Sequence, residues 1–106
     1  MKETVTFVTC RTARDAKKIA SALVKERLAA CANIVPGVTS IFTWKGKVEQ
    51  DREWLLILKS KASLSKRLIS RVRKLHSYEV PEVITLPIVA GNPEYLKWVR
   101  ASTREK

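Results

Sequence analysis

A chain of 106 residues with 45% hydrophobic side chains is long enough for one domain with a single core, and it leaves no room for a second. Its 21 lysines and arginines against ten acidic residues give a formal net charge of +11, a balance that attracts nucleic acid or another acidic surface. The opening MKETVTFVTC alternates polar and apolar residues, and no apolar run approaches the eighteen or so residues of a membrane span, so we expect a cytoplasmic protein with no membrane segment.

The first elements in chain order are a strand and a helix. Residues 4–10 favour a strand, because β-branched residues dominate and apolar side chains alternate. Thr12 stands three residues before Asp15, a spacing typical of a helix N-cap. Apolar residues then recur at helical spacing as far as Arg27, so we expect one helix with its apolar stripe facing the core.

The middle of the chain predicts a long hairpin. Residues 32–44 and 48–60 are rich in strand formers, and the KGK segment between them offers a glycine for a tight turn. The second arm contains WLLIL at residues 54–58, a continuous apolar run that requires cover on both faces of its strand.

The last third predicts a helix, a strand and a short helix. Ser63 or a nearby residue caps a second helix, its apolar residues recur every three or four positions, and it ends at His76. Residues 83–89 (VITLPIV) form a fourth strand, whose internal proline confines it to an edge or a bulge. Asn92 and Pro93 then supply the N-cap and first turn of the last helix.

The order βαββαβα predicts an α+β, ferredoxin-like βαββαβ sandwich with an extra C-terminal helix and a long β-hairpin, as one domain over residues 1–106. Both main helices would cover one sheet face and leave the other bare. The hairpin is also too long for a globule of this size and should project. A bare apolar face and a projecting hairpin both invite pairing with further copies, so we expect a homo-oligomer.

Three segments carry a specific resemblance: KERLAACANIVPGVTSIF, WKGKVEQDREWLLILK and LHSYEVPEVITLPIVAGNPEYLKWV, in this order and nearly without gaps from Lys25 to Val99. They closely resemble the CutA divalent-cation tolerance family. The resemblance implies a homotrimer held together through the long hairpins, an architecture similar to P-II-type regulatory proteins, and a link to copper tolerance. It implies no enzyme activity, so we expect a protein that acts by binding a metal ion or small ligand.

The same resemblance implies a binding cleft between subunits. The residues that match the family's recurrent motifs there are Cys31, Trp44, Lys59, His76, Tyr78, Glu82 and Trp98. Two positions depart from the family pattern. Ser77 stands where proline commonly follows the histidine, and Arg11 stands where a proline often closes the first strand.

The metal hypothesis starts from His76, the one histidine of the chain, with Cys10 or Cys31 as a soft second ligand, because imidazole and thiolate both suit copper. One histidine and two distant cysteines fall short of a closed zinc site, so no cofactor is obligatory and copper or another divalent cation is the candidate. A histidine at a helix C-terminus also has a purely structural use beside the helix dipole, and both roles stay open.

Nucleic acid is the rival partner on composition. Seven bases and no acid lie between Lys59 and Lys74, and most of these bases occupy the helix face opposite its apolar residues. No aromatic residues interleave with them, and no known nucleic-acid recognition motif is present. We therefore expect no specific nucleic-acid partner, and at most weak, sequence-independent and salt-dependent association with polyanions.

Overall fold

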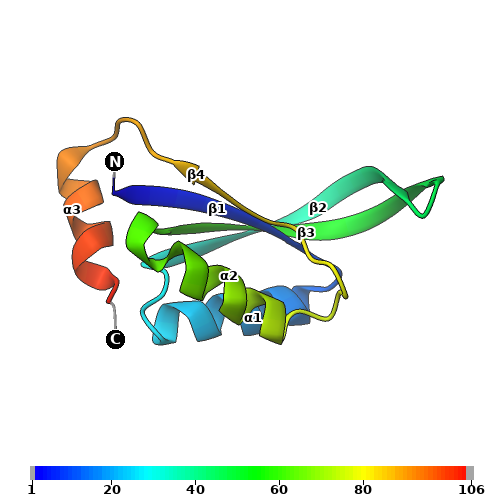
Figure 1. Ribbon diagram of the computed structural model, residues 1–106, viewed down its shortest axis with the longest axis horizontal. Coiled ribbons are helices and arrows are strands. Elements are labelled where there is room, and N and C mark those ends of the chain that lie inside the picture. The colour runs from blue at the N-terminus through cyan, green and yellow to red at the C-terminus, as the bar shows by residue number, and fades with distance from the viewer. Residues whose placement is uncertain (1, 105–106) are drawn as a thin grey trace.

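The computed structural model describes residues 2–104, which form one four-stranded antiparallel sheet with two helices against one face and a third at its end (Figure 1). The elements are β1 (Glu3–Cys10), α1 (Ala13–Lys25), β2 (Cys31–Trp44), β3 (Lys47–Lys61), the short 3-10 helix η1 (Ala62–Leu64), α2 (Ser65–Leu75), β4 (Val83–Pro87) and α3 (Pro93–Ser102). The strand order is β2-β3-β1-β4, and every neighbouring pair is antiparallel. The α+β ferredoxin-like fold predicted from the sequence is confirmed.

Helix α1 begins where its sequence predicts. The Thr12 side-chain oxygen accepts a hydrogen bond of 3.0 Å from the backbone N–H of Asp15, which satisfies one free donor of the first turn. The apolar stripe faces the core, with Ala16, Ile19, Ala20 and Leu23 buried. The helix ends at Lys25, and Arg27 lies beyond it with φ of 62°, so the predicted extent was two residues too long.

Helix α2 starts differently from the prediction. Ser63 is not its cap, because Ala62–Leu64 form η1 and Leu64 stands at the helix start without a side-chain cap bond. The 3-10 turn supplies local backbone bonding there in place of a capping side chain. The helix ends at Leu75 with His76 as its C-cap, as predicted.

The core lies between the sheet and the two helices. Side chains of β1 and β3 meet those of α1 and α2 in one cluster, whose largest fully buried members are Ile19, Leu23, Leu56, Leu58, Leu64, Leu68, Val8 and Val72. The WLLIL run of β3 is covered on its helix side, where Leu56 and Leu58 are fully buried. Leu55 and Ile57 point to the opposite face and are only half-buried.

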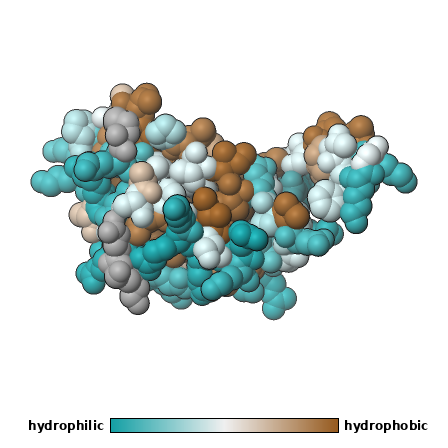
Figure 2. Space-filling view, viewed as in Figure 1, coloured by the Kyte–Doolittle hydropathy of each residue, from teal (hydrophilic) through white to brown (hydrophobic). Residues whose placement is uncertain are grey.

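The sheet face away from the helices is apolar and partly open. Phe7 pairs with Ile57 on one side and with Ile84 on the other, and Val5 pairs with Leu86, so one row of apolar side chains crosses three strands. Ile84 and Leu86 remain 49% and 47% exposed. Figure 2 shows apolar surface over this part of the molecule and on the hairpin, above a mainly hydrophilic helical side.

The hairpin of β2 and β3 projects from the body (Figure 1). Lys45 and Gly46, with φ of 52° and 81°, form its two-residue turn, the conformation that matches strand twist in tight hairpins. A bulge at Pro36 and Gly37 interrupts the register, and Gly37 takes φ of 73° there. The molecule measures 43 × 26 × 22 Å, and its radius of gyration of 14.1 Å exceeds the roughly 13 Å of a sphere-like domain of this length.

Helix α3 packs across the end of the sheet and is capped by Asn92, whose side chain accepts from the N–H of Glu94. Its N-cap and first-turn proline follow the prediction, whereas β4 ends at Pro87, two residues short of the predicted strand. As the last strand in the sheet order, β4 is an edge strand. In the described part of the chain, no helix is long and apolar enough to cross a membrane.

Candidate functional site

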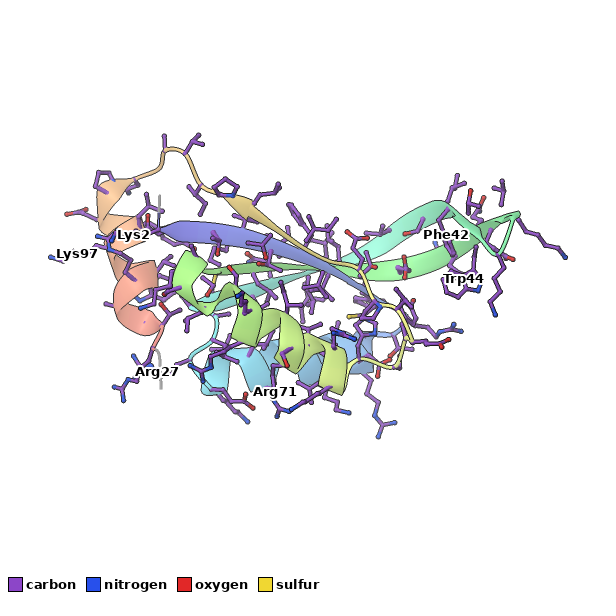
Figure 3. All side chains as sticks on the ribbon, viewed as in Figure 1. Lys2, Arg27, Phe42, Trp44, Arg71 and Lys97 are labelled. Atoms are coloured by element: carbon purple, nitrogen blue, oxygen red, sulfur yellow. The ribbon has the colours of Figure 1, made fainter. Side chains whose placement is uncertain are left out.

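A groove of about 800 Å³ lies where the hairpin leaves the body, beside the loop that follows α2. Hairpin residues form one wall, and Thr9, Arg11 and the loop form the other. The groove is lined by Thr9, Arg11, Ser40, Ile41, Phe42, Trp44, Glu49, Asp51, Glu53, Ser77, Tyr78, Glu79, Val80 and Glu82. Figure 3 shows that two of its aromatic side chains, Phe42 and Trp44, come from the hairpin.

Three acidic residues of β3 give the groove its main chemical character. Glu49, Asp51 and Glu53 stand at every second position of the strand, so their side chains share one face of the hairpin. On the neighbouring strand β2, Phe42 pairs with Glu49 and Ser40 pairs with Asp51. None of the three was predicted from the sequence as a site residue. The signal was available, because acids at every second position of a predicted strand form a ladder on one face.

The groove is acidic in a strongly basic protein. Five of the ten acidic residues of the chain line it, two of them (Glu79 and Glu82) from the loop after α2. Among residues 2–104, Arg11 is the one base that lines it, and its guanidinium carbon lies 5.7 Å from the centre of the Tyr78 ring. Arg11 and Ser77, the two departures from the family pattern, therefore both lie in this groove.

Tyr78 ties the loop to the hairpin. Its hydroxyl donates a hydrogen bond of 2.6 Å to Oε2 of Glu53, a residue that is only 7% exposed. Burial, together with this bond and the negative charge of Glu53, raises the pKa of Tyr78 far above its usual value of 10.0. The phenol therefore stays protonated at neutral pH and keeps donating to the carboxylate.

His76 lies behind the groove wall and is 8% exposed. Its Nε2 lies 2.7 Å from the carbonyl oxygen of Thr9, and its Nδ1 accepts a bond of 3.0 Å from the backbone N–H of Tyr78. This pattern places the ring proton on Nε2 and occupies both nitrogens. His76 thus positions Thr9 and Tyr78, and a metal ion at its ring would first have to displace one of these bonds.

The predicted role of His76 and Cys10 as metal ligands stays a prediction, and the surroundings of Cys10 bear on it. Cys10 is fully buried, and burial, with nearby Asp15 and Glu53, raises its pKa from 9.0 to about 12. Since the thiolate is the form that binds metal, these surroundings work against Cys10 as a ligand. Among residues 2–104, no three histidine, cysteine, aspartate or glutamate side chains form a group that could hold a metal ion.

The residues predicted for the cleft fall into two groups. Trp44, Tyr78 and Glu82 line the groove. Cys31 and Lys59 instead form a directly opposed pair near the far end of β2 and β3, which α3 also contacts. Lys59 and Asp51 are eight residues apart on one strand, which corresponds to roughly 26 Å.

The second group forms a small cluster of its own on one subunit. The Cys31 sulfur lies 3.5 Å from the Tyr95 hydroxyl, and the Tyr95 and Trp98 rings are 5.6 Å apart. The Lys59 ammonium donates to the side-chain oxygen of Asn33. Tyr95 and Trp98 are 40% and 45% exposed, so this cluster presents aromatic surface to its surroundings.

Comparison with known proteins identifies the family. Residues 4–102 match the family model described as CutA1 divalent ion tolerance protein. Protein CutA of Mus musculus is 53% identical over 97 residues, which is 92% of this chain and 55% of that protein. The divalent-cation tolerance protein CutA of Thermus thermophilus is 50% identical over 101 residues, 95% of this chain and 98% of that protein.

Solved structures agree with the sequence comparison. The Thermus thermophilus Cut A1 structure superposes with a TM-score of 0.94 at 50% identity, covering 96% of this chain and 99% of its own. CutA1 from Oryza sativa gives 0.95 at 46% identity, covering 100% and 97%. The chain spans about half the length of the mouse and human relatives, and one Arabidopsis relative is named chloroplastic. Residues 4–102 place this chain plainly within the CutA1 divalent ion tolerance family.

Proposed function

We propose that this protein binds divalent cations, copper among them, in the acidic groove, and that it does so as a homotrimer by binding rather than by turnover. The observation that carries the proposal is the concentration of acid: half of the acidic residues of a +11 chain line one groove. A negative recess in a positive protein attracts cations to that one place. Carboxylate oxygens suit divalent ions, and copper leads the affinity series among them.

One chain supplies charge but not a finished coordination shell, since none of the residues from 2 to 104 converge as a set of three ligands. A neighbouring copy would complete the site. The two groups of predicted cleft residues lie at opposite ends of the hairpin strands, and a neighbouring copy that presents its Cys31, Lys59 and Trp98 at the groove would bring them together. The projecting hairpin and the open apolar sheet face support such packing.

The test is a calorimetric titration of Cu(II), Zn(II) and Mn(II) into wild type and the double variant Glu49→Gln/Asp51→Asn. We expect the loss of these two neighbouring carboxylates to weaken metal binding at least about tenfold, as the loss of charged ligands at a metal site does. The control is Glu94→Gln, which removes one exposed acid on α3, outside the groove. Light scattering checks that all three proteins assemble alike. Equal affinities in wild type and the double variant would contradict the groove as the cation site.

A second candidate is a small organic ligand, as in the P-II-type regulatory proteins that the predicted architecture resembles. The aromatic rings of Phe42, Trp44 and Tyr78 in the groove favour it, because such rings hold apolar and cationic groups. An amine such as spermidine should then bind in competition with Mn(II). Failure of amines to bind, with intact metal binding, would leave the cation proposal alone.

The cytoplasmic location remains our prediction for this protein. It is checked by fractionating the source cell with markers for each compartment. Recovery in a membrane-enclosed compartment other than the cytoplasm would contradict it.

A further inference from the structure

The outer surface of the two packed helices is a second charged feature, and the groove does not explain it. Helices α1 and α2 together carry nine lysines and arginines and one acid, Asp15. Within α2 there is no acid at all. The chain has therefore separated its charges: acids gather at the hairpin groove, and bases gather on the helical layer.

The bases form two rows that face outward. On α1, Arg14, Lys18 and Lys25 recur at spacings of four and seven residues, so they lie on one line of the helix, and all three are exposed. The α1 row is about 16 Å long at 1.5 Å per residue. On α2 the exposed bases are Lys66, Arg67, Arg73 and Lys74. Packed helices lie about 8–10 Å apart, so the two rows form one basic face.

Of the two acids near this face, Glu26 pairs with Arg71, and Asp15 is one acid against the nine bases of the two helices. Glu26, at the end of α1, accepts two hydrogen bonds of 2.9 Å from the guanidinium of Arg71, which ties α1 to α2 (Figure 3 labels Arg71). Asp15 accepts from the Ser77 hydroxyl at 3.1 Å. Exposed Ser21 and Ser70 lie between the outward bases of their helices and add hydroxyl donors, which commonly bond to phosphate.

We infer that this basic face, defined by Arg14, Lys18, Lys25, Lys66, Arg67, Arg73 and Lys74, binds the phosphate backbone of duplex nucleic acid without reading its sequence. A duplex carries one charge per about 1.7 Å of axis, so a two-row face meets several phosphates at once. Sequence readout is not expected, because the two helices carry no aromatic residue and the chain has no known recognition motif. The inference is independent of the groove and goes beyond the proposed function.

A membrane of anionic lipid is the competing polyanion, and the composition of the face disfavours it. Surface helices that lie in a membrane insert a broad apolar face with aromatic or leucine side chains. Here Ile19, Leu23 and Leu68 of α1 and α2 are buried in the core, and Ile69, at the flank of the basic face, is partly buried. The one exposed large apolar side chain on the two helices is Val24, at 38%. A face that carries charge but no broad apolar surface to insert into lipid suits the phosphates of a rigid duplex better than a membrane.

The experiment measures fluorescence anisotropy of a 20-base-pair labelled DNA duplex against the full chain from about 50 to 200 mM salt. With four phosphate contacts, the affinity should fall roughly 100-fold across this range, since each contact contributes about −0.9 to the slope of log K against log salt. The double variant Lys18→Gln/Lys66→Gln should reduce the slope by about 1.8. Two duplexes of unrelated sequence should bind equally.

The matched control is Lys2→Gln/Lys97→Gln, which removes the same charge from exposed positions at the α3 end of the molecule (Figure 3). It should keep the wild-type slope. The inference is overturned if wild type does not bind the duplex at about 50 mM salt, or if both pairs lower the slope equally. It is also overturned if phosphatidylserine vesicles bind through Lys18 and Lys66 while the duplex does not. The variant Glu49→Gln/Asp51→Asn should bind the duplex at least as tightly as wild type, which separates this result from the groove.

Discussion

Tyr78 joins three parts of the molecule at one side chain. Its hydroxyl bonds to Glu53 on the hairpin, its ring lies 4.6 Å from the ring of His76, and Arg11 lies over its face. The backbone N–H of the same residue bonds to His76. Through these contacts a single residue sets the position of the loop against the acidic wall of the groove.

Both tyrosines of the chain should resist ionisation in the folded protein. The pKa of Tyr95 is raised to about 12, first by its hydrogen bond with Cys31, and that of Tyr78 is raised further. A folded pKa above the unfolded value leaves stability unchanged below about pH 10 and lowers it as pH rises beyond that. Absorbance at 295 nm should therefore show little tyrosinate at about pH 10.5 in native protein and about full ionisation of both in denaturant by pH 11.5.

The variant Tyr78→Phe assigns the signal. It should remove one of two tyrosines from the titration and leave the Glu53 carboxylate without its donor, at a cost of about 1–3 kcal/mol in unfolding free energy. A native tyrosine that ionises near pH 10 and disappears in this variant would contradict the raised pKa of Tyr78.

His76 should prove to be a positioning residue. Replacing it by alanine leaves the Thr9 carbonyl and the Tyr78 N–H without their partners, so unfolding free energy should fall by about 1–3 kcal/mol. Urea denaturation measures this loss. Cu(II) affinity should fall less in His76→Ala than in Glu49→Gln/Asp51→Asn. Loss of one copper per chain in His76→Ala alone would restore His76 as a ligand.

At this scale the sequence predicted where some residues lie better than what each one contacts. Trp44, Tyr78 and Glu82 were expected at a cleft and do line the groove. The ligand role expected for His76 depended on knowing where its ring nitrogens point, which follows from the contact of β1 with the loop across 67 positions of sequence. Sequence spacing cannot supply such a contact.

At the scale of elements, α3 is held mainly by polar contacts from distant segments. The guanidinium of Arg100 donates to Oε2 of Glu3 at 2.6 Å, and Arg27 donates to the carbonyls of Ser102 and Ala101 at 3.3 and 3.2 Å. Lysine and arginine at these last carbonyls offset the negative end of the helix dipole. One apolar residue, Val99, is fully buried beneath the helix.

The docking of α3 should weaken in acid. The hydrogen bond from Arg100 lowers the pKa of Glu3 below its usual 4.5, so this contact contributes stability above that pH and loses it as pH falls further. Hydrogen exchange of the α3 amides, compared at about pH 6 and pH 3.5 after correction for intrinsic rates, should show reduced protection in acid. Glu3→Gln should show lower protection at the higher pH and a smaller change with pH, whereas the exposed control Glu94→Gln should behave as wild type. Identical pH dependence in wild type and Glu3→Gln would contradict this account.

Element boundaries were predictable where a local bond decides them. The Thr12 cap and the Asn92 cap each bond to an N–H two or three residues away, so short spacing identified them. The start of α2 was not predictable in this way, because the chain enters it through η1 without a capping side chain. Arg27 ends the helix in a local turn at φ of 62°, because its N–H bonds to the Val24 carbonyl and the next N–H bonds to the Leu23 carbonyl. An arginine stands there in place of the usual glycine, so no residue type signals this turn in the sequence.

For the whole molecule, the open sheet face gives the sharpest test of assembly. Replacing Ile84, which is 49% exposed, by lysine puts a charge on that face and should release monomers of 12.0 kDa from a trimer of about 36 kDa. The control Val24→Lys changes an apolar residue of similar exposure on the helical layer and should leave the trimer intact. Sedimentation velocity distinguishes the two, and circular dichroism confirms that both remain folded. A wild-type chain that sediments as a monomer at micromolar concentration would refute the trimer.

The overall architecture was predictable because apolar periodicity and turn residues agree along the chain. The projecting hairpin followed from strand length alone, and the 43 Å long axis confirms it. The groove was not predictable as a place, because it forms only when β1, the hairpin and the loop after α2 meet.

The prolines of the two edge strands also affect how readily the chain could form fibrils. Proline has no N–H, so Pro36 in β2 and Pro87 in β4 each remove one backbone donor from an edge strand that could otherwise pair with another chain. At Pro36 the bulge also bends the strand and divides its outer edge into two short runs. The chain therefore lacks a long, straight edge on which cross-β stacking could propagate, which disfavours fibril growth.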